Sequence, residues 1–221
     1  MGNFPENLNK KLLEIVNMIV ALAGDTGAGK STLARLLKKP LNTRILTIGY
    51  ILRANARKQS LPFEEYLRRI ESQYGLSAHK KALEGYIRKK LQKFRTVVVE
   101  GTYKIEDIQT LQSLFPKEPL FVFYVESAKN IRIVRIMNRQ KVDKYKATGW
   151  VRDQDMIRKN RFRMEEVAKI ADGRIINSGL TKRELFEEFT RQFKKAMGKR
   201  IVNALPGTSP KSKNIQMRRK H

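Results

Sequence analysis

Residue types and spacing near the start of the chain point to phosphate chemistry. The run Gly24, Asp25, Thr26, Gly27, Ala28, Gly29, Lys30, Ser31 follows an apolar stretch and leads through Thr32 into a helical pattern. Backbone N–H groups of such a glycine-rich turn, at the positive end of a helix, form a concave nest for phosphate oxygens. Lys30 adds positive charge for the β- and γ-phosphates, and the Ser31 hydroxyl is placed to ligate Mg²⁺. The sequence therefore predicts that residues 24–32 bind ATP or GTP with Mg²⁺.

Short β-branched or aromatic runs alternate with helical patterns along the chain. We expect strands at 18–23, 44–48, 96–100, 120–125 and 174–176. We expect helices at 30–38, 51–57, 63–72, 77–94, 105–114, 128–138, about 151–170 and from 181 onward. This alternation predicts an α/β fold of three layers, in which helices cover both faces of a five-stranded parallel sheet. Because ligands bind at the carboxyl ends of such strands, the residues just after each strand are the candidates for a site.

Two strand ends carry residues suited to phosphoryl transfer. Arg53 follows the second strand, and its guanidinium could clamp a phosphate in a bidentate way; an ordinary exposed helix arginine is the alternative. The third strand ends in Glu100 and Gly101. The carboxylate could hold an Mg²⁺-bound water or take a proton from an attacking hydroxyl, and the glycine lets a substrate approach the backbone. Asp25, inside the glycine-rich run, is a second candidate base.

These segments resemble those of P-loop nucleoside monophosphate kinases. The run 47–54 is similar to the acceptor-binding segment S-T-G-D-x-L-R-A and matches it at Gly49, Leu52, Arg53 and Ala54. The resemblance implies that Arg53 contacts the acceptor monophosphate, although Tyr50 stands where the family has Asp. The run 97–101 looks like the V-V-x-[DE]-G segment of small P-loop kinases.

A basic stretch after the fourth strand is similar to the lid of adenylate and cytidylate kinases. Arg135 and Arg139 lie one helical turn apart and match the R-[IL]-x-x-R that opens that lid. Lys141, Lys144, Lys146 and Arg152 continue the positive charge. The resemblance implies a short lid at about 139–152, in which Arg135, Arg139 and Arg152 neutralise the transferring phosphoryl group and closure excludes water. A solvated basic helix is the alternative.

Two later features extend the resemblance. Arg152 and Arg163 have the spacing of the family's second pair of lid arginines, with Asp155 keeping one of two acids and Gln154 replacing the other. The run 171–179 looks like the last strand and adenine-side loop of dephospho-CoA kinases and their archaeal relatives. That resemblance implies that Asn177 lies beside the nucleotide base, where an ordinary turn is the alternative.

The length and the charge of the chain limit its domain organisation and its partners. The chain of 221 residues suits one kinase-type domain at 1–198, with acceptor-binding helices at about 50–94, and a basic tail at 199–221 that we expect to be disordered from about 201. Lys and Arg number 47 against 21 acidic residues, a net charge of +26, which attracts nucleotides and allows a nucleic-acid partner. A lineage with lysine-rich proteins would show the same balance.

Cysteine and apolar content exclude several classes of protein. The chain has no cysteine, which excludes disulfides and thiolate zinc sites and suits a reducing, cytoplasmic setting. No apolar run reaches the ~18 residues of a membrane span, so we expect no membrane partner.

The leading hypothesis is an Mg·ATP-dependent kinase that phosphorylates a small phosphorylated or nucleotide-like acceptor. The alternatives are a dephospho-CoA kinase, a nucleic-acid-associated P-loop kinase or ATPase, and a nucleotide-binding regulatory module without turnover. The resemblance covers about residues 16–198, and only the glycine-rich run is highly specific.

Overall fold

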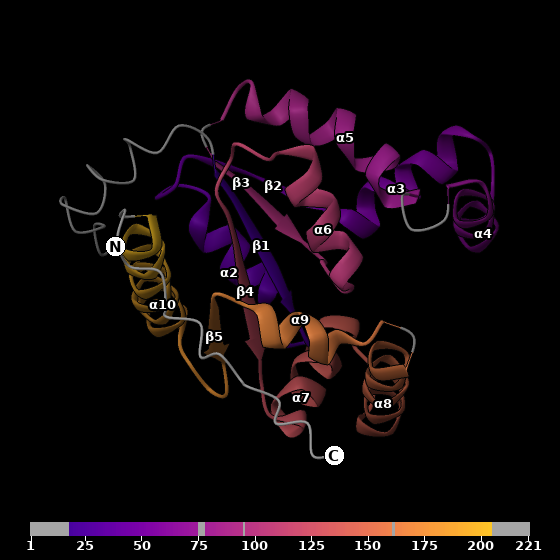
Figure 1. Ribbon diagram of the computed structural model, residues 1–221. Helices are drawn as coiled ribbons and strands as arrows, with labels where there is room; N and C mark the ends of the chain where they lie inside the picture. The colour runs from indigo at the N-terminus through magenta and orange to yellow at the C-terminus, as the bar shows by residue number, and fades with distance from the viewer. Residues whose placement is uncertain (1–17, 75–77, 95, 161, 205–221) are drawn as a thin grey trace, which may run out of the picture.

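The computed structural model describes residues 18–74, 78–94, 96–160 and 162–204 (Figure 1). Its five strands form one sheet in the order β2-β3-β1-β4-β5, and every neighbouring pair is parallel. The strands are β1 (Met18–Gly24), β2 (Thr43–Thr47), β3 (Thr96–Glu100), β4 (Leu120–Glu126) and β5 (Gly173–Ile176). This architecture confirms the predicted α/β fold with a five-stranded parallel sheet.

Helices connect the strands and cover both faces of the sheet (Figure 1). They are α2 (Lys30–Leu37), α3 (Ile48–Lys58), α4 (Phe63–Tyr74), α5 (Ala78–Leu91), α6 (Ile105–Leu114), α7 (Lys129–Gln140), α8 (Lys144–Asn160), α9 (Met164–Ile170) and α10 (Lys182–Ala204). Each strand of a parallel sheet needs a crossover to the next, and these helices supply it.

The alternation of side chains along the strands divides the core into two layers. Ile19 and Ala21 of β1 face one side, where they pack with residues of α3, α4, α5, α6 and α9. Val20 and Leu22 face the other side, where α2 and α10 cover them. Because β1 is central and buried on both faces, its sequence reads as a continuous apolar run. The sheet therefore holds the carboxyl ends of β1, β3 and β4 in fixed register.

The segment expected to be polar from 139 to 150 is mostly helical. α8 begins at Lys144, and its Ala147 and Val151 pack against Ile136 of α7 in a small core of their own. The side chain of Asp143 accepts a hydrogen bond from the Lys146 N–H at 2.8 Å and so caps the helix. Only a narrow apolar stripe of α8 faces α7, and lysines surround it. The helical pattern is therefore weak in the sequence.

The last helix runs further than expected. α10 continues to Ala204, beyond the domain end predicted at 198. Residues 205–221 of the predicted tail and residues 1–17 lie outside the described part, so the domain limits stay a prediction. Within the described residues, no helix is both long and apolar enough to span a membrane.

Candidate active site

The glycine-rich run forms a turn between β1 and α2 that only glycine fits. Gly24, Gly27 and Gly29 have φ values of 128°, 79° and 107°. A Cβ on Gly24 would lie 1.9 Å from the carbonyl oxygen of Val125, and one on Gly29 would lie 2.2 Å from Nδ2 of Asn177. No side chain caps the start of α2, whose first turn holds no acid. The free N–H groups and the positive helix end therefore suit an anion.

Lys30 lies buried inside this turn. Its Nζ donates hydrogen bonds to the carbonyl oxygens of Gly24 and Asp25, both at 2.7 Å. Burial, and then the nearby positive charge of Arg158, lower the pKa of Lys30 from 10.5 to about 7, although Glu100 and Asp25 partly offset them. A phosphate beside the ammonium would favour its charged form, so the residue is held where an anion would stabilise it.

Ser31 and Glu100 meet at the mouth of the turn. The Ser31 hydroxyl donates to Oε1 of Glu100, although 69 residues separate them in sequence. A hydroxyl next to a carboxylate supplies the hard oxygen ligands that Mg²⁺ accepts, directly or through water. In the described ranges no group of three or more His, Cys, Asp or Glu could hold a metal by itself. The pair therefore fits an ion that takes its remaining ligands from phosphates and water.

Three guanidiniums converge on carbonyl oxygens of the turn. Arg132 donates to the Thr26 carbonyl at 3.4 Å, and Arg158 donates to the Gly24 carbonyl at 3.3 Å. Arg135 donates to the carbonyls of Gly27 and Ala28, both at 3.2 Å. These contacts occupy carbonyl oxygens of the turn and gather three positive charges beside it.

Asp155 fixes one of these arginines. Its two carboxylate oxygens accept from Nη1 and Nη2 of Arg132, both at 2.7 Å, in a bidentate pair that joins α8 to α7. The Nε of Arg132 and the Oγ1 of Thr26 are buried without a hydrogen-bond partner. Unpaired buried polar atoms beside the turn indicate a place where a polar ligand completes the bonding.

Asn177 belongs to the same constellation. Its side-chain Nδ2 donates to the Ala28 carbonyl at 2.7 Å, and its backbone carbonyl accepts a hydrogen bond from Arg135 at 3.0 Å. The residue is buried after β5. It therefore lies against the glycine-rich turn and its amide braces the turn, while its predicted place beside the nucleotide base stays a prediction.

Tyr103 lines the space between the turn and α8. The Arg158 guanidinium lies 4.6 Å from its ring centroid, and Lys30 Nζ lies 5.7 Å from it. Gly101 has a φ of 90°, a backbone conformation that favours glycine, and its backbone lies beside this ring. Burial raises the pKa of the Tyr103 hydroxyl. The ring thus shields the charged groups from water on one side.

Asp25 and Arg53 occupy two edges of the site. The Asp25 carboxylate accepts from the Tyr124 hydroxyl at 3.3 Å, and burial followed by this carboxylate raises the pKa of that hydroxyl. Arg53 is exposed on α3, with its guanidinium 4.7 Å from the Phe63 ring. One of its nitrogens donates to the Gly49 carbonyl at 3.4 Å.

Two arginines predicted for the lid make other contacts. Arg139 lies over the Trp150 ring at 5.8 Å, and Arg152 contacts Asp153 at 3.1 Å. Both side chains are exposed. Arg135 is the member of the predicted set that contacts the glycine-rich turn.

Arg132, Arg158 and Tyr103 are the residues that inspection of the sequence missed. Arg132, Arg135 and Arg139 recur at helical spacing, so the stripe on α7 could have drawn attention to the first of them. Arg158 offers no such signal, because 134 residues separate it from Gly24.

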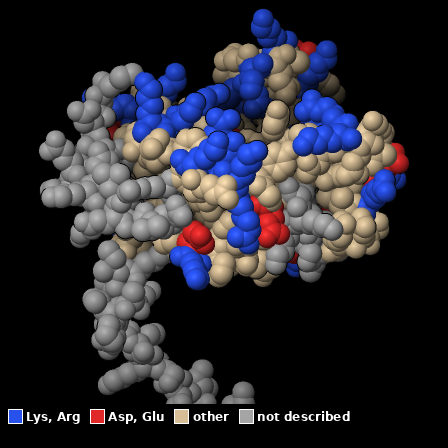
Figure 2. Space-filling view, turned by 90° about the horizontal axis from the view of Figure 1, so that it is seen from above, with Lys and Arg blue, Asp and Glu red and all other residues tan. Residues whose placement is uncertain are grey.

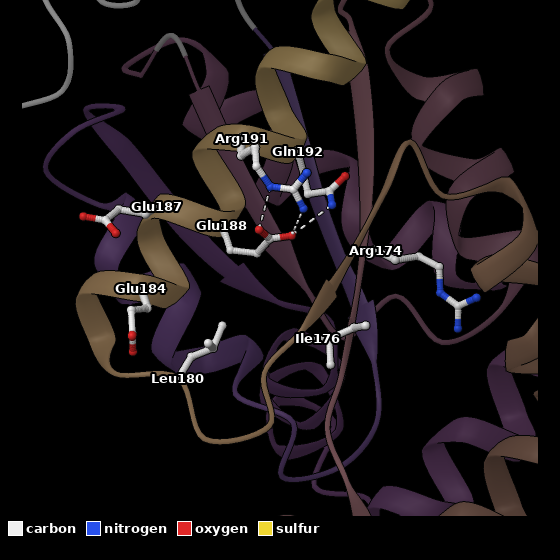
Figure 3. Close-up of a pocket in the computed structure, with 8 residues that line it drawn as sticks. All are labelled: Arg174, Ile176, Leu180, Glu184, Glu187, Glu188, Arg191 and Gln192. Carbon is white, nitrogen blue, oxygen red and sulfur yellow. Dashed lines mark hydrogen bonds and ion pairs between the residues drawn. The ribbon is translucent and has the colours of Figure 1, made fainter.

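A separate pocket lies between β5 and α10 (Figure 3). Its lining includes Glu184, Glu187 and Glu188, and the last of these is bonded to Arg191 and Gln192. Arg174 and Arg191 also line it, and none of the lining residues is hydrogen-bonded to the glycine-rich turn in the described part of the chain, so we assign this pocket no part in nucleotide binding.

Comparison with known proteins agrees with this geometry. The sequence profile of a family described as an AAA domain matches residues 23–148, which is more than half of the chain. A UPF0200 protein of Pyrococcus abyssi is 29% identical over 179 residues, covering 79% of this chain and 92% of its own. A cytidylate kinase of Sulfurisphaera tokodaii is 24% identical over 148 residues, covering 66% and 75%.

Solved structures show the same fold. A gluconokinase from Sinorhizobium meliloti superposes with a TM-score of 0.55 at 12% identity, covering 86% of this chain and 99% of that one. A shikimate kinase from Acinetobacter baumannii gives a TM-score of 0.51 at 18% identity, covering 84% and 97%. With its glycine-rich turn, buried lysine and five-stranded parallel sheet, the chain belongs to this AAA-domain family of P-loop proteins.

Proposed function

We propose that the protein is an Mg·ATP-dependent kinase that phosphorylates a small nucleotide-like acceptor. The observation that carries the proposal is the convergence of Lys30, Arg132, Arg135 and Arg158 on one glycine-rich turn beside the Ser31–Glu100 pair. Phosphoryl transfer is catalysed by positioning and by neutralising negative charge, which are what such a cluster supplies. The similarity to a cytidylate kinase supports the same class of reaction.

Each part of the site has a role in this proposal. Residues 24–32 bind the triphosphate, with Lys30 beside the β- and γ-phosphates and Asn177 bracing the turn from the base side. Ser31 and Glu100 hold Mg²⁺, which supplies charge neutralisation when bound. The arginines on α7 and α8 stabilise charge on the transferring group, and the sequence predicts the same role for Arg139 and Arg152.

The acceptor is proposed to bind between Arg53 and Gly101. An acceptor oxygen forms a bond to the γ-phosphorus while the bond from that phosphorus to the β–γ bridging oxygen breaks, and ADP leaves with the bridging oxygen. A phosphate acceptor attacks as an anion. A hydroxyl acceptor would give its proton to Glu100, which lies at the end of β3 next to Gly101.

An acceptor panel tests the proposal. ADP release would be measured with Mg·ATP and, in turn, nucleoside monophosphates, nucleosides, dephospho-CoA and no acceptor. We expect a nucleoside monophosphate to stimulate ADP release well above the rate without acceptor. Stimulation by dephospho-CoA alone would favour the alternative acceptor, and stimulation by none would contradict the kinase proposal.

Replacing Arg158 tests whether this arginine, which the structure places at the turn, contributes more to nucleotide binding than Arg152, which the sequence predicts. Arg158→Met removes the guanidinium that contacts the Gly24 carbonyl but keeps an unbranched side chain next to Tyr103. Loss of one charged hydrogen-bonding group should weaken Mg·ATP binding about 10- to 100-fold, measured by calorimetry. Lys159→Met, on the exposed face of the same helix, is the matched control. A larger loss in Arg152→Met than in Arg158→Met would contradict the assignment and favour the predicted lid residue.

The lowered pKa of Lys30 predicts proton uptake on nucleotide binding. Its pKa is about 7 in the free protein, and a bound polyphosphate raises it by favouring the ammonium. Binding of Mg·ADP should therefore take up about one proton at about pH 8.5, where free Lys30 is mostly neutral, and almost none at about pH 6. Titration calorimetry in buffers of different ionisation enthalpy measures this number. A binding heat independent of the buffer at the higher pH would contradict the assignment.

A further inference from the structure

The end of the molecule where the strands begin carries a second concentration of positive charge. Lys38 and Lys39 follow α2, Arg44 is the second residue of β2, Lys93 follows α5 and Lys117 precedes β4. All five are exposed. Because each lies before a strand of the parallel sheet or at its beginning, they share the edge opposite the glycine-rich turn. We call these five residues the amino-end surface.

Acidic residues do not balance this charge. The segments 38–44, 92–94 and 115–119 contain one acid, Glu118. Within the described ranges, none of the five basic side chains forms an ion pair. Figure 2 looks onto this end from above, and the blue Lys and Arg side chains spread across it outnumber the red acidic ones. The surface therefore presents uncompensated positive charge to solvent.

α10 brings further basic residues to the same end. Phe193 packs against Phe121, near the start of β4, with ring centroids 5.0 Å apart. The next residues of α10, including the exposed Lys194, therefore lie at the edge where the strands begin. From here the chain continues into residues 199–221, whose sequence has seven Lys or Arg and no acid.

Apolar anchors are missing from this surface. The large hydrophobic side chains that are exposed among the described residues are Tyr50, Val134, Tyr145, Met156, Ile157, Ile170 and Ile176. None of them lies in the segments that form the amino-end surface. A membrane surface would be bound with the help of inserted apolar side chains, and the centres of protein interfaces are poor in lysine. A nucleic-acid backbone needs only spread positive charge.

We propose that the amino-end surface binds the phosphate backbone of a nucleic acid without reading its sequence. The surface lies at the opposite end of the sheet from the nucleotide turn. Both sites can therefore be occupied together, and each can be tested without the other.

A charge-neutralised variant tests the proposal. In the test variant Lys38, Lys39, Arg44, Lys93 and Lys117 are all replaced by Gln. The matched control carries the same five-charge change at exposed positions of and around α7, α8 and α9: Lys129, Lys141, Lys144, Lys159 and Lys169. Fluorescence anisotropy would follow the binding of a labelled single-stranded oligonucleotide and a labelled duplex over a salt series, with phosphatidylserine vesicles as a third probe.

We expect the test variant to lose about tenfold or more in affinity for the oligonucleotides and to show a shallower salt slope by two or more units. The control variant should lose less than about threefold, because net charge alone acts weakly across the molecule in salt. The test variant should keep the phosphotransferase rate of the parent protein, so that this result stands apart from the kinase proposal.

Three outcomes would overturn the proposal. The first is equal loss of affinity in the two variants, which would mean that overall charge and not this surface binds. The second is binding of vesicles without binding of either oligonucleotide. The third is the absence of oligonucleotide binding by the parent protein at physiological salt.

Discussion

Lys30→Met is expected to abolish phosphoryl transfer while making the free protein more stable. Loss of the ammonium removes the positive charge that would neutralise the transferring phosphoryl group and should lower turnover at least about 10²- to 10³-fold. Stability should rise because a buried cation is replaced by an apolar side chain of similar length. Both carbonyls that Lys30 contacts keep a second donor, Arg158 for Gly24 and the Ala28 N–H for Asp25. We expect a gain of about 1 kcal/mol or more, or about 2–4 °C in Tm.

The pH dependence of this gain identifies its cause. The folded protein releases the Lys30 proton at about pH 7, whereas an unfolded lysine releases it near 10.5. Between these values the unfolded state binds more protons, so the stability of the parent protein rises with pH relative to the variant. The difference in Tm should be largest at or below pH 7 and should shrink as the pH approaches 10. A variant that is less stable than its parent at pH 7, or that still turns over, would contradict the account. Lys169→Met, an exposed lysine of α9, is the control.

Glu100→Gln is expected to lower kcat about 10²-fold or more with a smaller change in KM for ATP. The amide keeps the size of the side chain, and its oxygen can still accept a hydrogen bond from the Ser31 hydroxyl. The fold should therefore be unaffected. It loses the negative charge proposed to hold Mg²⁺ and the basicity proposed to accept a proton from a hydroxyl. The measurement is steady-state kinetics over a range of Mg²⁺ concentrations, and the variant should need more of the ion.

A second strand of the same sheet, β4, supplies the control for this prediction. Glu126 also ends a parallel strand, but it pairs with Arg174 at 2.8 Å and not with the glycine-rich turn. Glu126→Gln should keep the parent's kcat. If the two variants lost activity equally, the position of Glu100 beside Ser31 would not be the cause.

The sequence predicts the parts of the site that local rules determine. The glycines predict a turn with positive φ, and the apolar runs predict strands that are buried on both faces of the sheet. Because parallel strands end at one edge, Glu100 could be expected near Ser31 across 69 residues. The bounds of β3 and α6 agree with those expected, since each is flanked by residues that end the pattern.

The arginine cluster could not be predicted in full, because it depends on how α7 and α8 pack. The contacts of Arg132 and Arg158 are set by the angle at which α8 crosses α7, which rests on Ile136, Ala147 and Val151. Three apolar residues within a lysine-rich stretch give little periodic signal. The ion pair between Asp155 and Arg132 can be recognised only when the packing of α8 on α7 is known.

Tracing the γ-phosphoryl group tests the central claim most directly. The protein would be incubated with Mg·ATP labelled at the γ-phosphorus and with each nucleoside monophosphate, and the labelled products would be separated. We predict label in a nucleoside diphosphate, formed by the parent protein and not by Lys30→Met. Label that appears only as inorganic phosphate, whichever acceptor is present, would show an ATPase and would contradict the proposed transfer.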